Sequence, residues 1–168
     1  MLSNLDFVIF PDRCEVIEII PSQRYFYPIF KNGSSSVYEQ AKVSKWKIFL
    51  NEKNKRIPTV DVVIRDPRQR LISGINSFIT QTVKANPLLD RNTVFWFAKN
   101  YLHLNRHYCM QYAWLLNLAR YLAPDAKINL LGMDSIKQIT DFTENPWGQK
   151  DTAISAELVN LPAQEMYH

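Results

Sequence analysis

Two short segments contain the residue types that bind phosphate or sulfate groups. The first, Phe30–Ser36, places one lysine, one glycine and three serines together. A glycine lets the backbone turn tightly, and a following helix N-terminus offers unpaired amides to an anion. Lys31 adds a full positive charge, but it precedes the glycine, unlike the lysine of the NTPase phosphate loop. The alternative is an ordinary strand–helix turn in which serines cap the helix.

The second segment runs from Val62 to Ser73 and contains an arginine directly after a buried, β-branched stretch. Open α/β sheets bind ligands in the crevice beyond the carboxyl ends of their strands, which is where Arg65 would lie. A guanidinium can grip a phosphate with two parallel hydrogen bonds. Ser73, on the second turn of the next predicted helix, would add a hydroxyl. Alternatively, Arg65 only pairs with Asp66 or with a helix end.

The elements that position these segments follow from apolar periodicity and turn residues. Asp66 as N-cap and Pro67 at the first helical position begin a helix that is interrupted from Ala85. The pattern predicts strands at Leu5–Phe10, Cys14–Ile20, Arg24–Phe30, Thr59–Ile64 and Lys127–Leu131. It predicts further helices at Ser35–Leu50, Asn92–Leu102, Asn105–Leu122, from the N-cap Asp134 to about Glu144, and at Ser155–Leu161. Strands that alternate with helices indicate an α/β fold with a mostly parallel central sheet flanked by helices.

Composition indicates one folded domain over residues 1–168. The chain is 46% hydrophobic and 21% charged, as in ordinary globular proteins. Two cysteines cannot form a disulfide framework, and they suit a reducing compartment. We find neither a signal peptide nor a stretch apolar enough to span a membrane, so we expect a cytoplasmic protein without a membrane span.

Charge is unevenly distributed along the chain. The net charge is only +4, but residues 42–70 hold nine Lys or Arg against three Asp or Glu, and the segment from Asp134 onward is acidic. A basic middle predicts an anionic ligand, although a lysine-rich helix face exposed to solvent would give the same pattern. Because the sequence lacks zinc-finger spacing and an RNA-recognition signature, we do not expect a nucleic-acid partner. The oligomeric state is left open.

Together the two segments resemble the sulfotransferases that use 3′-phosphoadenosine-5′-phosphosulfate (PAPS), and most closely their carbohydrate-type branch. The resemblance rests on a Lys–Gly–Ser loop followed by strand–Arg65–Asp66–Pro67–x–x–Arg70–x–x–Ser73. It implies a P-loop-like three-layer fold, no metal, and a small-molecule or saccharide acceptor with a hydroxyl group. It also implies that Arg65 and Ser73 hold the 3′-phosphate of PAPS. The 5′-phosphosulfate would then be held by Lys31, Asn32, Gly33, Ser34, Ser35 and Ser36.

The same resemblance suggests the catalytic groups. Lys31 would stabilise the leaving phosphate oxygen, and a His or Glu would deprotonate the acceptor. The element from His107 to Gln111 is similar to a His–x–x–Pro–Gln element of the branch, which makes His107 the leading candidate for the base. His103 on the same helix face, Glu39 and Glu52 are the other candidates. A single straight helix over Ser35–Leu50 would carry Glu52 about 24 Å away from the sulfur.

Two other classes of function remain possible. The first is a kinase or NTPase of similar fold, although the sequence lacks a GK[ST] element and an obvious acidic residue after a strand to hold Mg²⁺. The second is a non-catalytic module that binds an anionic polymer, whose affinity would fall steeply with salt.

Overall fold

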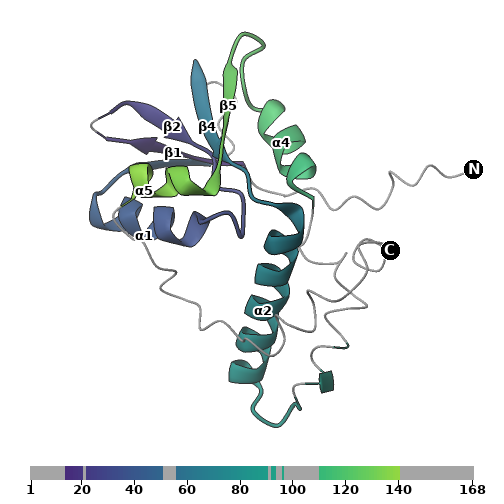
Figure 1. The fold of residues 1–168 in the computed structure, drawn as a ribbon. Helices are drawn as coiled ribbons and strands as arrows, with labels where there is room; N and C mark the ends of the chain where they lie inside the picture. The colour runs from purple at the N-terminus through teal and green to yellow at the C-terminus, as the bar shows by residue number, and fades with distance from the viewer. Residues whose placement is uncertain are drawn as a thin grey trace, which may run out of the picture.

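A computed structural model describes residues 14–20, 22–50, 56–90, 92–93, 96 and 110–140. These residues form a five-stranded mixed sheet with the order β3-β1-β2-β4-β5 (Figure 1). Its strands are β1 (Glu15–Ile19), β2 (Arg24–Phe26), β3 (Lys47–Leu50), β4 (Thr59–Val63) and β5 (Lys127–Leu131). Strand β1 pairs antiparallel with both β2 and β3, whereas β2, β4 and β5 run parallel. The expected parallel arrangement therefore holds for one half of the sheet.

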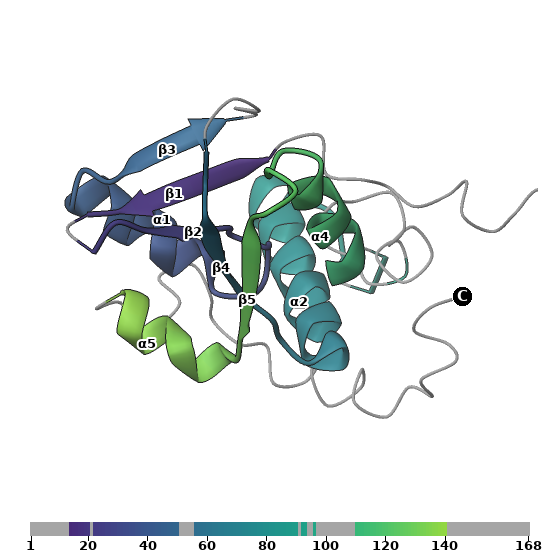
Figure 2. The ribbon, with the colours of Figure 1, turned by 90° about the horizontal axis from the view of Figure 1, so that it is seen from above.

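Helices cover both faces of this sheet (Figure 2). On one face, α1 (Ser34–Val43) and α5 (Ile136–Ile139) contribute Val37, Ala41, Ile136 and Ile139 to a core with Ile17, Phe26 and Val63 of the strands. On the other face, Trp114 and Leu118 of α4 (Gln111–Ala119) pack with Val16, Val60 and Val62. Successive residues of β4 point to opposite faces of the sheet: Val60 and Val62 belong to one core and Val63 to the other. This is the pattern of a strand that is buried on both faces.

Asp61 is the one charged residue of β4, and its carboxylate is only 4% exposed. The Arg24 guanidinium lies 2.5 Å from one carboxylate oxygen, and the Asn129 amide donates to the other at 3.0 Å. A buried carboxylate needs such partners, because losing hydration without them is costly. Asp61 is therefore accommodated as a structural residue within the parallel half of the sheet.

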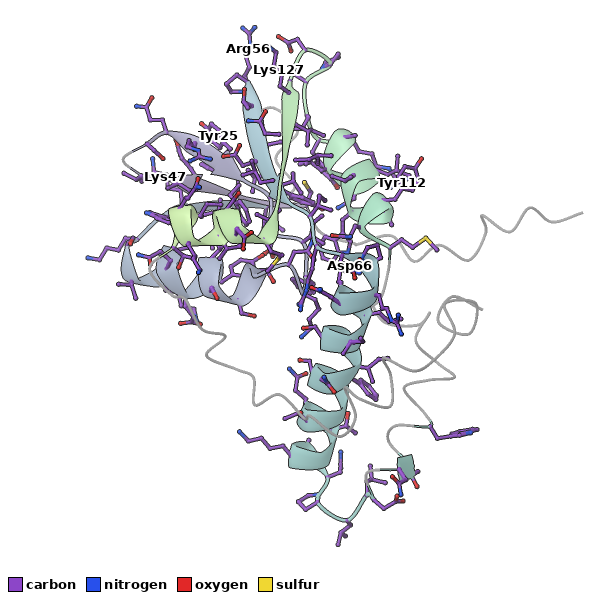
Figure 3. The ribbon with its side chains drawn as sticks, in the orientation of Figure 1. Tyr25, Lys47, Arg56, Asp66, Tyr112 and Lys127 are labelled. Carbon is purple, nitrogen blue, oxygen red and sulfur yellow. The ribbon has the colours of Figure 1, made fainter. Side chains whose placement is uncertain are left out.

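The long helix α2 (Pro67–Ala85) begins as the sequence predicts. The Asp66 carboxylate accepts a hydrogen bond from the Gln69 amide at 2.8 Å, and Pro67 occupies the first turn. In Figure 3, Arg56 and Lys127 mark the amino-terminal ends of β4 and β5, and Asp66 lies at the opposite end of these strands. The N-cap therefore fixes the direction in which the chain leaves the carboxyl end of β4.

Four predicted elements differ from the structure. Within the helix predicted over Asn105–Leu122, α4 begins only at Gln111, because Met110 is its extended N-cap (ψ 143°), and it ends at Ala119. The helix predicted over Ser35–Leu50 ends at Val43; Lys45 adopts a left-handed φ of 55°, and the chain turns back into β3. Strand β2 stops at Phe26, before Pro28, which lacks the amide a longer ladder would need. Gly132 rather than Asp134 is the N-cap of the short 3₁₀ turn η2 (Met133–Ser135) that precedes α5.

Some predictions fall on residues that the structure does not describe. These are the strand Leu5–Phe10, most of the helix Asn92–Leu102, the amino-terminal part of Asn105–Leu122, and the helix Ser155–Leu161. Among the described segments, none of the helices has both the length and the apolar character needed to cross a bilayer.

Candidate functional site

The three parallel strands bring the two predicted segments to one edge of the sheet. Phe26 of β2 lies opposite Asp61 of β4, and Val63 of β4 lies opposite Leu131 of β5. Because Lys31 follows Phe26 by five residues and Arg65 follows Asp61 by four, their segments leave the sheet at the same level. The carboxyl ends of neighbouring parallel strands are the usual ligand site of open α/β sheets.

A cavity of about 250 Å³ lies at this edge. Its described lining comes from the chain that follows β2, β4 and β5. The lining residues are Lys31, Gly33, Ser34, Ser35, Ser36, Arg65, Ser73, Met133, Ile136 and Lys137. Three of these are cationic and none is acidic, so among the described residues the pocket wall has a uniformly positive charge. Such a wall favours an anionic ligand.

The first loop is tightly wound around two left-handed residues. The Asn32 amide donates to the Ile29 carbonyl at 3.1 Å, and this turn holds Lys31 at φ 69°. Gly33 has φ 79°, and a Cβ there would lie 2.9 Å from Cδ1 of Ile136. Glycine is therefore required at position 33 both by the backbone and by the close approach of α5. A lysine with a positive φ is uncommon, and such conformations gather at binding sites.

The N-terminus of α1 faces the pocket without a side-chain cap. Its N-cap is Gly33, and among the described residues no side chain accepts a hydrogen bond from its first amides. Serine capping, the alternative interpretation of this loop, is therefore not what the structure shows. Instead, Ser34, Ser35 and Ser36 form the first turn and line the pocket. Unpaired amides and the helix dipole there give partial positive charge.

Two arginines of the second segment hold carbonyls of the first. Nη1 of Arg65 donates to the Lys31 carbonyl at 3.2 Å, and Nε of Arg70 donates to the Phe30 carbonyl at 3.0 Å. These two hydrogen bonds attach the first loop to the chain that follows β4. Arg65 does not simply pair with Asp66, because its guanidinium reaches the loop and lines the pocket.

The cations in and beside the pocket perturb one another. Burial, together with the charges of Arg70 and Arg65, lowers the pKa of Lys31 to about 8. Burial also lowers the pKa of Arg65, and Asp66 partly offsets that effect. A bound anion would favour the charged form of Lys31 and reverse its shift. Perturbed groups that converge on a pocket are typical of functional sites.

The other predicted site residues have different positions. The Asn32 side chain is 1% exposed and bonds to protein groups rather than lining the pocket. Ser73 lines the pocket from α2. Glu39 pairs with Lys42 at 2.8 Å and is not among the described lining residues. His107, His103 and Glu52 lie outside the described residues. The distance argument against Glu52 no longer applies, because its premise, one helix over Ser35–Leu50, is wrong: the helix ends at Val43.

Three pocket residues were missed by the sequence analysis. Met133, Ile136 and Lys137 all follow β5, which was itself predicted with the correct bounds. Because β5 pairs with β4 in parallel, the carboxyl ends of both strands lie on the same side of the sheet. The residues just beyond Leu131 could therefore have been predicted to line the pocket. Arg70 belonged to the recognised motif, but its role in holding the Phe30 carbonyl depends on tertiary contact.

Within the described part of the chain, no group of three or more His, Cys, Asp or Glu is arranged to hold a metal ion. Comparisons with protein-family models, with curated proteins and with solved structures each found no match.

Proposed function

We propose that the protein is a sulfotransferase that moves a sulfuryl group from PAPS to a hydroxyl group of an acceptor, with a saccharide as the preferred class. One observation carries the proposal: the Lys31–Ser36 loop and the Arg65/Ser73 pair line a single pocket. PAPS has an anionic group at each end of its ribose, and its recognition needs two such donor clusters. The proposal includes a P-loop-like arrangement of the α/β fold around that pocket.

In the proposed complex, each donor cluster holds one end of the nucleotide. The amides at the start of α1 and the Lys31 ammonium hold the 5′-phosphosulfate, as helix N-termini do for phosphates. The Arg65 guanidinium and the Ser73 hydroxyl hold the 3′-phosphate. Lys137, from α5, adds a third positive charge to the same wall. The described cavity, at about 250 Å³, lies below the usual range for ligand pockets, so in the proposal it holds only part of the nucleotide.

The proposed reaction is an in-line displacement at sulfur. The acceptor oxygen forms the new S–O bond, and the bond from sulfur to the bridging 5′-phosphate oxygen breaks. The electron pair of that bond remains on the phosphate oxygen, and the hydroxyl proton passes to a base. Because negative charge grows on the leaving oxygen, a cation held there lowers the barrier. Lys31 has this role, and its loss would cost on the order of 10²–10³ in rate.

The proposed reaction also needs a base for the acceptor hydroxyl. The described lining residues include neither a histidine nor a carboxylate, so the base comes from another part of the chain. We retain His107, from the element that ends at Gln111, as the proposed base. Gln111, the last residue of that element, lies at the start of α4, and its side chain contacts the Arg65 backbone of the second anion segment.

Calorimetric titration with adenosine 3′,5′-bisphosphate, the product nucleotide, tests the proposal. The parent protein should bind it, and Arg65→Ala should weaken binding about 10- to 150-fold, as expected for hydrogen bonds to a charged group. Arg68→Ala is the matched control, because Arg68 is exposed one turn away on α2 and does not line the pocket. Equal affinity of the parent and Arg65→Ala would contradict the assignment.

The same titration separates the two rival classes of function. A kinase or NTPase would bind ATP in a magnesium-dependent manner and would not prefer the bisphosphate. A module for anionic polymers would bind heparin with an affinity that falls steeply with salt, and the bisphosphate would not compete. Transfer of sulfate from PAPS to a saccharide acceptor, with loss in Lys31→Ala, would complete the case for the sulfotransferase.

A further inference from the structure

The Gln111 side chain lies between the two anion-binding segments and bonds to both. Its Oε1 accepts from Nδ2 of Asn32 at 2.5 Å and from the Arg65 amide at 3.0 Å. Its Nε2 donates to the Arg65 carbonyl at 2.7 Å. One side chain thus contacts the loop after β2 and the chain after β4 from a third element, the first turn of α4.

Asn32 extends this connection to the sheet. The same Nδ2 that donates to Gln111 also donates to the Val63 carbonyl at 2.7 Å, at the last residue of β4. Asn32 is 1% exposed and its bond to the Val63 carbonyl is buried, so water does not compete for that bond. The backbone of the first loop is therefore tied to β4 through Asn32, and to Arg65 through Gln111.

Gln111 itself is not among the residues that line the pocket. Its bonds fix where Asn32 and the Arg65 backbone lie relative to each other. The pocket-lining residues next to them, Lys31, Gly33 and Ser34 on one side and the Arg65 guanidinium on the other, are positioned through the same bonds. Gln111 therefore holds Asn32 and the Arg65 backbone together from outside the described pocket wall.

We propose that Gln111 is a positioning residue that sets the distance between the two anion-binding clusters, so that one nucleotide with an anion at each end can reach both. This inference rests on the proposed function. A two-ended ligand gains affinity only if its second contact is made at the correct separation. A ligand with one anion does not depend on that separation.

Gln111→Met is the direct test, because methionine keeps the length and approximate volume of glutamine and removes all three hydrogen bonds. The dissociation constants for adenosine 3′,5′-bisphosphate, adenosine 5′-monophosphate and adenosine 3′-monophosphate are measured by calorimetry. We expect the bisphosphate to bind at least 10-fold more weakly in Gln111→Met, whereas each monophosphate changes less than about 3-fold. The ratio of bisphosphate to monophosphate affinity is the readout, since a general loss of structure would weaken all three ligands alike.

Gln81→Met is the matched control, since Gln81 is an exposed residue of α2 whose amide bonds only to Ser77 among the described residues. This variant should keep the parent's affinity ratio. If Gln111→Met does not fold, Gln111→Glu is measured instead; it keeps the acceptor oxygen for Asn32 and loses the donor to the Arg65 carbonyl. We expect it to lower the ratio at least 3-fold.

The outcomes separate this inference from the proposed function. If the parent binds the bisphosphate and the variant keeps the parent's ratio, the positioning role is wrong and the proposed function stands. Equal weakening of all three ligands likewise overturns the positioning role. If the parent binds none of the three nucleotides, the proposed function fails, and the inference that depends on it fails too.

Discussion

Lys31 is held in a backbone conformation that suits glycine better than lysine. Its φ of 69° places it in the left-handed region, where a residue with a Cβ atom is disfavoured by about 1–2 kcal/mol. Lys31→Gly removes this strain and the charge together, whereas Lys31→Ala removes the charge and keeps the strain. Both variants relieve the repulsion from Arg65 and Arg70 equally. The difference between their unfolding free energies therefore reports the backbone conformation at position 31 alone.

The expected difference follows from two opposing terms. Relief of the left-handed strain favours Lys31→Gly, and the greater freedom of glycine in the unfolded chain offsets about 0.4–1 kcal/mol of that gain. We expect Lys31→Gly to be about 1 kcal/mol more stable than Lys31→Ala, which corresponds to a Tm about 2–4 °C higher. Both variants should lose affinity for adenosine 3′,5′-bisphosphate by about 10- to 150-fold, because a charged donor is lost.

Urea denaturation and calorimetric titration measure the two effects separately. A Lys31→Gly variant no more stable than Lys31→Ala would refute the argument that the loop stores strain at this position. Retention of the parent's affinity in either variant would refute the assignment of Lys31 to the anion. The strain at position 31 and the contact of Lys31 with the anion are both supported only if Lys31→Gly is more stable than Lys31→Ala and both variants lose affinity for the bisphosphate.

Three further predictions concern pH and the residues that shape the pocket. Because the free protein holds the pKa of Lys31 at about 8 and the anion needs its charged form, bisphosphate affinity should be level from about pH 7 to 8, where the phosphates of the ligand are ionised, and should fall up to tenfold per unit above pH 8; a slope above pH 8 that persists in Lys31→Met would contradict this. Gly33→Ala should lower stability by at least 1 kcal/mol in thermal unfolding, and its cost should be smaller, but not zero, when both proteins compared carry Ile136→Ala, because the clash is removed and the positive φ remains; no cost in the Ile136→Ala background would show that strain is absent. Asp66→Ala should cost about 1 kcal/mol of unfolding free energy by removing the N-cap of α2, and Asp66→Asn should cost much less, whereas equal losses would argue against a capping role.

Local sequence patterns predicted the elements whose signals are strong and short-range. The β-branched run of β4, the strand β5 and the Asp66–Pro67 start of α2 were each predicted close to their observed bounds. These elements place Arg65 at the carboxyl end of a strand, and a strand buried on both faces is typical of a parallel sheet, whose ligand sites lie at such ends. The residues of the pocket wall were therefore largely predictable once two parallel strands were assigned.

Non-local pairing explains the main error in the fold. The segment after Val43 contains neither glycine nor proline, so nothing in its composition ended the predicted helix. Lys45 nevertheless turns the chain at a positive φ, and the next residues become β3 because they pair with β1. That pairing depends on residues about thirty positions earlier, which periodicity within the segment does not reveal.

The role of Gln111 could not be predicted for a similar reason. In the sequence, it stood out only as the last residue of an element similar to one in the sulfotransferases. Its three hydrogen bonds reach Asn32, 79 positions away, and Arg65, 46 positions away. Asn32 was predicted to bind the nucleotide, since it lies inside the loop, yet its side chain points to Val63 and Gln111. Whether a loop side chain faces the ligand or the protein depends on the backbone turn, which here includes the positive φ of Lys31.

The central claim is that one nucleotide joins the two anion-binding segments, and a crystal structure of the protein with adenosine 3′,5′-bisphosphate tests it most directly. We predict the 5′-phosphate within hydrogen-bond distance of the Ser34–Ser36 amides and the Lys31 ammonium, and the 3′-phosphate at Arg65 and Ser73. Density for the nucleotide elsewhere on the molecule, or with only one of its phosphates in contact with these segments, would contradict the account.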